Sequence, residues 1–311
     1  MGKPFPSSQA GFDHRWVFQG PVVRIARWRC RHSRADPGSE RAQPAPMIIF
    51  MHSGSFRANS SDAIGLLDCT RVGLFNAGVP FQSAHPYGGN DSGSDLAIRP
   101  DVLGEILARH DPEAANRPDR PFRVGWGPCD PASFLLHRVL LRKTSSARAH
   151  VDALEVEELS LLLAGRIAAS ALGGRPPGLE GGNARERIEA EALRGVLSSS
   201  PGRPHRLDDL ARRFGSTPFR LCRSFRAATG STIHRHLTGI RLHRAVDRLA
   251  DGCSDLTGLA LDLGFSSHSH FTSAFRKGLG VTPEGVRRLA SRGGLSSLRR
   301  TLAPSRAAAR N

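Results

Sequence analysis

No apolar run in the sequence is long enough to cross a membrane. The hydrophobic fraction is 39% and the charged fraction is 23%, which are values of an ordinary globular protein. A membrane helix needs roughly 20 consecutive apolar residues, and no stretch approaches that length. Residues 1–16 contain one early Lys but no apolar segment and no small-residue cleavage site, so a secretory signal is not expected. We therefore expect a cytoplasmic protein with no membrane partner.

Cysteine is sparse and carries no spacing pattern. The odd number of five cysteines and the lack of any CxxC pair argue against a disulfide framework and against a structural zinc site. We expect free and mostly buried thiols, and no metal or cofactor. The five residues are Cys30, Cys69, Cys129, Cys222 and Cys253.

Acidic residues are outnumbered, and the excess of basic residues is concentrated in one part of the chain. The whole sequence has a formal net charge of +16. Residues 183–311 carry 23 Lys and Arg against 10 Asp and Glu, whereas residues 1–182 carry 21 against 18. A basic module of this kind suits a polyanion, because contacts to phosphates release counterions and favour association.

A length of 311 residues favours at least two domains, and the sequence texture divides the chain accordingly. Residues 12–130 contain short apolar runs between Gly and Pro, such as MIIFM at 47–51, and predict β-strands in a sandwich or barrel. Residues 131–172 have helical apolar periodicity. Residues 173–183 are rich in Gly and Pro and predict a linker. The fold class is therefore a multidomain α+β protein.

The C-terminal part, residues 184–290, is expected to be all helical, followed by a basic tail at 291–311 that is expected to be disordered. It contains an internal repeat. LDDLARRFG at 207–215 aligns with LTGLALDLG at 256–264, and after one inserted residue Phe225 aligns with Phe275 and Gly230 with Gly280. One supersecondary unit therefore occurs twice.

Each unit has the outline of a helix-turn-helix. A short apolar helix is followed by a Gly that permits a tight turn, and then by a second helix with a capping residue. Thr217 is the expected cap in the first unit, with Pro218 as the first helical residue, and Ser266 or Ser267 is the expected cap in the second. Residues 234–250 predict one continuous helix between the units, which would fix their separation.

These features resemble the DNA-binding domain of the AraC/XylS family of transcriptional regulators. The resemblance covers about 100 residues and is strongest in GFSSHSHFTSAFRKGLGVTPEGVRR at 264–288, which is similar to the family's signature segment. It implies a seven-helix domain whose two reading helices enter successive major grooves of double-stranded DNA. It also favours activation, with RNA polymerase as a further partner.

The resemblance implies DNA contacts at matched positions of the two units. In the first unit, Arg223 is the strongest candidate, because a guanidinium can bind guanine O6 and N7 together. The hydroxyl groups and helix N-termini are expected to hold phosphates. The expected base or phosphate contacts are Ser216, Thr217, Phe219, Arg220 and Arg223 in the first unit, and Ser266, Ser267, His268, Ser269, Thr272 and Ser273 in the second.

Residues 67–107 resemble, less specifically, the cupin-like sensory domain of many such regulators, which implies a small β-barrel and a small-molecule effector. Phe81, His85 and Tyr87 are candidate pocket residues. Catalytic cupins have a metal motif of two close His, a Glu and a later His, whereas His52 and His85 stand alone here. Both are therefore expected to be ordinary polar or packing residues.

The leading hypothesis is a ligand-responsive transcription factor that is not an enzyme. The first alternative is a metal-dependent cupin enzyme fused to a DNA-binding module, which the missing ligand motif disfavours. The second is a DNA-repair or alkyl-transfer protein with a reactive zinc-thiolate, which the scattered cysteines disfavour. The helices at 131–172 are also expected to form a homodimer, because their apolar stripes exceed what one packing face needs.

Overall fold

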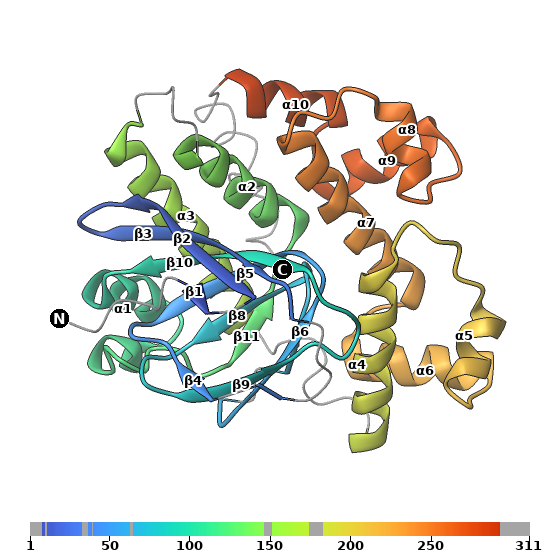
Figure 1. Cartoon of the computed structure of the whole chain (residues 1–311), viewed down its shortest axis with the longest axis horizontal. Helices are drawn as coiled ribbons and strands as arrows, with labels where there is room; N and C mark the ends of the chain where they lie inside the picture. Colours follow the sequence, from blue (N-terminus) through green and yellow to red (C-terminus); the bar gives the residue numbers. More distant parts are fainter. Residues whose placement is uncertain are drawn as a thin grey trace.

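The computed structural model describes residues 8–9, 11–32, 37–38, 40–62, 65–145, 151–173 and 183–292. An N-terminal β domain with three α-helices is followed by a helical C-terminal part (Figure 1), as the sequence predicts. Most of the predicted linker (residues 174–182) and nearly all of the predicted basic tail (residues 293–311) lie outside the described residues. Among the helices that the structure describes, none combines the length and apolar character of a membrane-spanning segment.

The strands of the β domain form two antiparallel sheets. The seven-stranded sheet has the order β1 (Ser8–Gln9), β2 (Phe12–Gln19), β3 (Val23–Cys30), β10 (Asp91–Ile98), β5 (Met47–Ser53), β8 (Arg71–Phe75) and β11 (Trp126–Pro128). The four-stranded sheet has the order β4 (Arg41–Ala42), β9 (Pro80–Ala84), β6 (Phe56–Ser60) and β7 (Gly65–Leu67). Within the described ranges neither sheet closes into the predicted barrel. The edge strands of the smaller sheet, at two and three residues, are too short to extend the hydrogen-bonded ladder around the domain.

The large sheet is apolar on both faces, which explains why residues 47–51 of β5 are all apolar. Successive side chains of a strand point to opposite faces. Met47, Ile49 and Met51 therefore join the core between the sheets, while Ile48 and Phe50 join the core beneath the helices. The core between the sheets is completed mainly by aromatic side chains, namely Trp28, Phe56, Phe75, Phe81 and Trp126.

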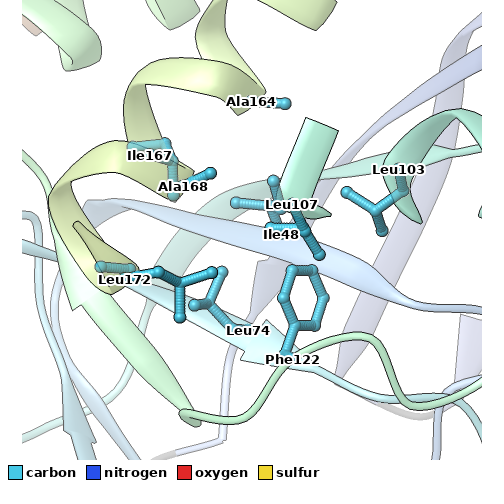
Figure 2. A pocket seen from close by; sticks show the side chains of 10 residues that line it. Ile48, Leu74, Leu103, Leu107, Phe122, Ala164, Ile167, Ala168 and Leu172 are labelled. Atoms are coloured by element: carbon cyan, nitrogen blue, oxygen red, sulfur yellow. The ribbon is translucent and has the colours of Figure 1, made fainter. Parts of the chain in front are cut away.

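Three helices contribute to the core on the outer face of the large sheet: α1 (Pro100–Ala108), α2 (Pro131–Ser145) and α3 (Ala153–Leu172). A cavity of about 10 Å³ remains between α1, α3 and the sheet, lined only by apolar side chains such as Ile48, Leu107 and Ile167 (Figure 2). This space is about that of one water molecule, and apolar cavities of this size stay dry. It is too small to be the predicted effector pocket.

Within residues 183–292, which the structure describes, the C-terminal part forms seven helices, as the resemblance implies. They are α4 (Ala184–Ser199), α5 (Leu207–Arg213), α6 (Pro218–Thr229), α7 (Ile233–Ala250), α8 (Leu256–Asp262), α9 (His268–Leu279) and α10 (Pro283–Arg292). Asn183 and Glu186 form a capping box at the start of α4. Gly230 and Gly280 end α6 and α9 with φ angles of 68° and 74°, which are left-handed conformations that favour glycine.

Helix α7 belongs to the cores of both helix-turn-helix units. Leu237 and Ile240 pack with the first unit, around Phe225 of α6. Val246 and Leu249 pack with the second unit in a cluster that continues into α2 and the outer face of the large sheet. The second unit therefore shares one continuous apolar core with the β domain.

We expect Phe225→Ala to lower the free energy of unfolding by about 3–5 kcal/mol, because it opens a cavity in the first unit's core. Phe219 on the same helix provides a matched control, since it is 78% exposed whereas Phe225 is 1% exposed. Phe219→Ala should change stability by about 0.5 kcal/mol or less. Urea unfolding followed by circular dichroism measures both. Equal losses for the two variants would contradict the assignment of buried and exposed faces on α6.

Candidate DNA-binding surface

The first unit presents α6 with its basic side chains outward. The turn before it passes through Gly215, whose φ is +57°, and Thr217 caps the helix by accepting a hydrogen bond from the Arg220 amide at 3.3 Å. Leu221 and Phe225 are buried. The outward positions are occupied by Thr217, Phe219, Arg220, Cys222, Arg223 and Arg226. An exposed helix N-terminus followed by guanidinium groups suits a phosphate backbone and guanine edges.

The second unit repeats this construction in α9. Ser267 is the cap, and its hydroxyl accepts from the His270 amide at 3.1 Å. Ser266 Oγ lies 3.0 Å from His270 Nδ1. Phe271 and Phe275 are fully buried, and the exposed residues near the start of α9 are His268, Ser269, His270 and Ser273. His270 and Ser273 therefore stand where the first unit has Arg220 and Arg223, whereas Arg226 is matched by the exposed Arg276.

Ser216 and Thr272 differ from the other predicted contacts. All the others are exposed, whereas these two are half-buried. Their hydroxyl oxygens are enclosed, and no hydrogen-bond partner for them is found among the described residues. They suit a role at the rim of a DNA contact better than one at a base edge. Cys222 and Arg226, which are not among the predicted contacts, share the exposed face of α6.

The second unit is joined to the β domain by a buried arginine on α2. Arg138 is 4% exposed and lies 2.9 Å from Asp247 of α7 and 2.9 Å from Asp251, the C-cap residue that follows the helix. Its Nη1 also donates to His52 Nδ1 at 3.3 Å. Burial, followed by the charge of Arg138, lowers the pKa of His52 well below its usual range, so a neutral His52 can accept this hydrogen bond. Arg244 of α7 donates to the His52 carbonyl oxygen at 2.8 Å.

The first unit is joined to the β domain by a second ion pair. Arg194 of α4 lies 2.9 Å from Asp68, and Ser198 donates to the same carboxylate at 3.2 Å. Burial alone would raise the pKa of Asp68, but Arg194 and His236 lower it well below the usual range. The carboxylate is therefore charged at neutral pH, and breaking such a pair would leave a buried charge without its partner.

These connections were not predicted from the sequence. Arg138 stands within the apolar stripe of FLLHRVLL at residues 134–141, and Gly195 stands in the middle of α4. A charge or a glycine in the interior of an amphipathic helix is unfavourable unless a neighbour requires it. Those two departures from helix pattern are the signal that could have located the domain interface.

The three predicted effector residues do not converge. Phe81 points into the core between the sheets, with its ring 4.8 Å from that of Phe75, and His85 is buried near Phe56. Tyr87 instead packs on α4, so closely that a Cβ on Gly195 would lie 2.2 Å from its ring. Tyr87 therefore belongs to the domain interface.

His52 and His85 also lie apart. His52 contacts Ser94, His137 and Arg138 on the helix side of the large sheet. His85 contacts Cys30 and Asp91 on the side that faces the small sheet. Across the described ranges there is no group of three or more His, Cys, Asp or Glu side chains that could hold a metal.

Residues 210–289 match a family model described as a helix-turn-helix domain. The chain is 36% identical over 107 residues to the HTH-type transcriptional activator RhaS of Pectobacterium atrosepticum, a match that covers 34% of this chain and 38% of the relative. The RhaS of Pectobacterium carotovorum is 36% identical over 103 residues. This chain thus spans less than half the length of the curated relatives it matches.

Two solved structures are similar in part. An AraC-type regulator from Chromobacterium violaceum is 26% identical, with a TM-score of 0.33, over 36% of this chain and 100% of that one. ToxT from Vibrio cholerae is 12% identical, with a TM-score of 0.34, over 91% of this chain and 100% of that one.

The repeated units, their capped reading helices and the family match define a double helix-turn-helix DNA-binding domain. Residues 210–289 of this part are similar to a helix-turn-helix domain, and the relatives that it matches are named HTH-type transcriptional activators.

Gly195→Ala should lower the free energy of unfolding by about 1–3 kcal/mol, because the added methyl group meets the Tyr87 ring and overpacks the interface. Gly239 in α7 is the matched control, since a Cβ there meets nothing within 4 Å. Gly239→Ala should raise stability by about 0.5–1 kcal/mol. Urea unfolding measures both. In a double-mutant cycle, Tyr87→Ala should suppress the effect of Gly195→Ala, and a stabilising Gly195→Ala would contradict the contact.

Proposed function

We propose that the protein is a sequence-specific DNA-binding transcriptional regulator whose β domain responds to a signal. The observation that carries the proposal is the pair of capped, exposed reading helices α6 and α9, whose cores share the single helix α7. One chain then reads two successive major grooves, because the shared helix fixes the spacing of the units. The net charge of +16, concentrated toward the C-terminus, favours a polyanionic partner.

The two reading helices have different roles in this proposal. Arg223 reads a guanine through two hydrogen bonds, and Arg220 adds a second guanidinium on the same face. The exposed Phe219 ring suits the methyl group of a thymine. In α9, His268, Ser269 and Ser273 contribute phosphate contacts and weaker base contacts, since a hydroxyl both donates and accepts. Specificity is therefore concentrated in the first unit.

The β domain is proposed to be the sensory module, of cupin-like type, with a small organic molecule as effector. Its inner face, around Phe81 and His85, is the candidate site. The domain contacts the first unit through Asp68 and Tyr87, which meet α4. It contacts the second unit through Arg138 of α2, which pairs with Asp247 of α7. A change in the β domain would thus alter the relative position of the two reading helices. Activation is favoured, with RNA polymerase as a further partner, because the curated relatives are named activators.

The structure leaves less exposed apolar surface for the proposed homodimer than the sequence suggests. The apolar face of α2 is covered by α7 of the same chain. Helix α3 leaves Leu154 and Leu162 exposed, at 74% and 41%, so the dimer is proposed to form through α3.

The enzyme alternative gains no support, because His52 and His85 face opposite sides of the large sheet. With DNA as its partner, the protein is proposed to act in the cytoplasm.

Footprinting of the full-length protein on a selected site should reveal two protected boxes on one face of the duplex, with centres about 10 base pairs apart. The boxes should differ in sequence, because α6 and α9 present different side chains. Hydroxyl-radical cleavage gives the resolution needed. A single protected groove, or a symmetric site occupied only by dimers, would contradict the proposal.

Arg223→Ala should lower affinity for the selected site by roughly 5- to 150-fold and abolish base preference in its box, which corresponds to about 1–3 kcal/mol for a bidentate contact to guanine. Ser273→Ala should change affinity by about threefold or less, which is under 1 kcal/mol. Fluorescence anisotropy at fixed salt, with either box scrambled, measures both. Arg99→Ala is the control for loss of one positive charge, since Arg99 is exposed in the β domain and pairs with Asp101. An equal loss for Arg223→Ala and Ser273→Ala would refute the asymmetry.

A further inference from the structure

Cys30, His85 and Asp91 form a buried cluster at one end of the core between the two sheets. Cys30 is the last residue of β3, His85 follows the last residue of β9, and Asp91 is the first residue of β10. The Cys30 Sγ lies 3.5 Å from His85 Nε2, and His85 Nδ1 donates to the Asp91 carboxylate. The three residues are 4%, 6% and 1% exposed. The order thiol, imidazole, carboxylate is that of an activated nucleophile.

Asp91 positions the imidazole. Its second oxygen accepts a hydrogen bond from the Ser55 amide at 3.0 Å, so the carboxylate is held from two sides. Because the Nδ1–H group donates a hydrogen bond to Asp91, the Nε2 edge of the ring faces the sulfur. Burial opposes protonation of His85, but its hydrogen bonds to Asp91 and Cys30 raise its pKa to about 9. The Nε2 edge of the imidazole therefore carries a proton beside the sulfur.

A second cation, Arg41, also interacts with Cys30. Burial lowers the pKa of Arg41, and the interaction with Cys30 opposes this effect. The Arg41 guanidinium donates to Ser83 Oγ at 2.6 Å and lies over the rings of Phe12 and Phe81. A fixed guanidinium and an imidazolium together make an electropositive environment, which is where reactive cysteines occur.

Other cysteines of the chain have different surroundings. Burial, followed by the charge of Asp68, raises the pKa of Cys69 to about 12. Burial and Asp130 raise the pKa of Cys129 well above its usual value. Both remain protonated thiols at neutral pH and are inert. Cys222 is exposed on α6, and Cys253 is half-exposed, with its sulfur 3.6 Å from the Asp255 carbonyl oxygen.

We propose that Cys30 is a peroxide-reactive thiol, with His85 as its proton donor and Asp91 as the positioning residue. The Cys30 thiolate attacks one oxygen of hydrogen peroxide, so an S–O bond forms while the O–O bond breaks. The departing hydroxide takes the proton held on His85 Nε2 and leaves as water. The sulfur is oxidised by two electrons to a sulfenic acid, and the peroxide supplies the oxidising equivalents.

Because the cluster is buried, only small oxidants are expected to reach the Cys30 sulfur. With 4% of Cys30 exposed, only a molecule of very few atoms reaches the sulfur without displacing Trp28 and Phe56, which share its core. Hydrogen peroxide has two heavy atoms, whereas a bulky electrophile needs a channel. The cluster lies where strands end, and the next residues along the chain, Arg31 and Pro86, are exposed. This reactivity is independent of DNA binding.

The test uses full-length reduced protein, hydrogen peroxide at low molar excess near pH 7, and dimedone to trap sulfenic acid, with labelled peptides quantified by mass spectrometry. Wild-type Cys30 should be labelled at least about tenfold faster than Cys129, which is equally buried but has no imidazole partner, and faster than the exposed Cys222. His85→Gln should lower the Cys30 rate by about tenfold while leaving the Cys222 rate unchanged. Cys30→Ser should remove the label from that peptide.

The comparison within the wild type keeps the test decisive if His85→Gln fails to fold, because all cysteines react in one sample. Circular dichroism identifies a misfolded variant. Labelling confined to Cys222, or Cys30 labelled no faster than Cys129, would overturn the proposal. So would a folded His85→Gln variant in which Cys30 reacts at the wild-type rate. Since the readout is peptide mass, it is unaffected by whether the protein binds DNA.

Discussion

Helix α7 is the element on which the rest of the structure depends, because three packed regions share it. Its first turns complete the core of the first helix-turn-helix unit, and its last turns complete that of the second. Asp247 of α7 and the C-cap residue Asp251 form ion pairs with Arg138 of the β domain. A continuous helix transmits a displacement along its length with little loss. The same helix therefore determines both the spacing of the reading helices and the attachment of the sensory domain.

The sequence was sufficient to predict the features that depend on local pattern. Repetition at offsets of 49 and 50 residues identified both units, and hydroxyl residues before Pro218 and His268 located the helix starts, with Thr217 and Ser267 as caps. Short apolar runs between turn residues predicted a β domain. These features follow from hydrogen bonding and hydrophobic periodicity over a few residues, which a single sequence displays directly.

Features that depend on contacts between distant segments could not be predicted in the same way. Arg194 and Asp68 are 126 residues apart, and no local rule relates them. The resemblance to a sensory domain predicts Tyr87 as a pocket residue, yet its ring packs on Gly195 of α4. Cys30 was interpreted as an ordinary buried thiol because its partners are 55 residues and more away in the sequence. The predicted barrel also depends on contacts between distant segments, because strand length alone does not specify which edge strands pair.

Strand β5 contains a bulge at His52, since Met51 pairs with Gly93 and Ser53 pairs with Ser92. The extra residue bends the strand and advances the turn that follows it. Gly54, with a φ of +75°, then brings its Cα so close to Asp91 that a Cβ would lie 1.7 Å from the carboxylate. The close packing of Gly54 against Asp91 thus depends on the number of residues in β5 as much as on their chemistry. In the divergence of such proteins, a one-residue deletion here would be less tolerable than many substitutions, since it would disturb the thiol cluster on one face and the domain contacts on the other.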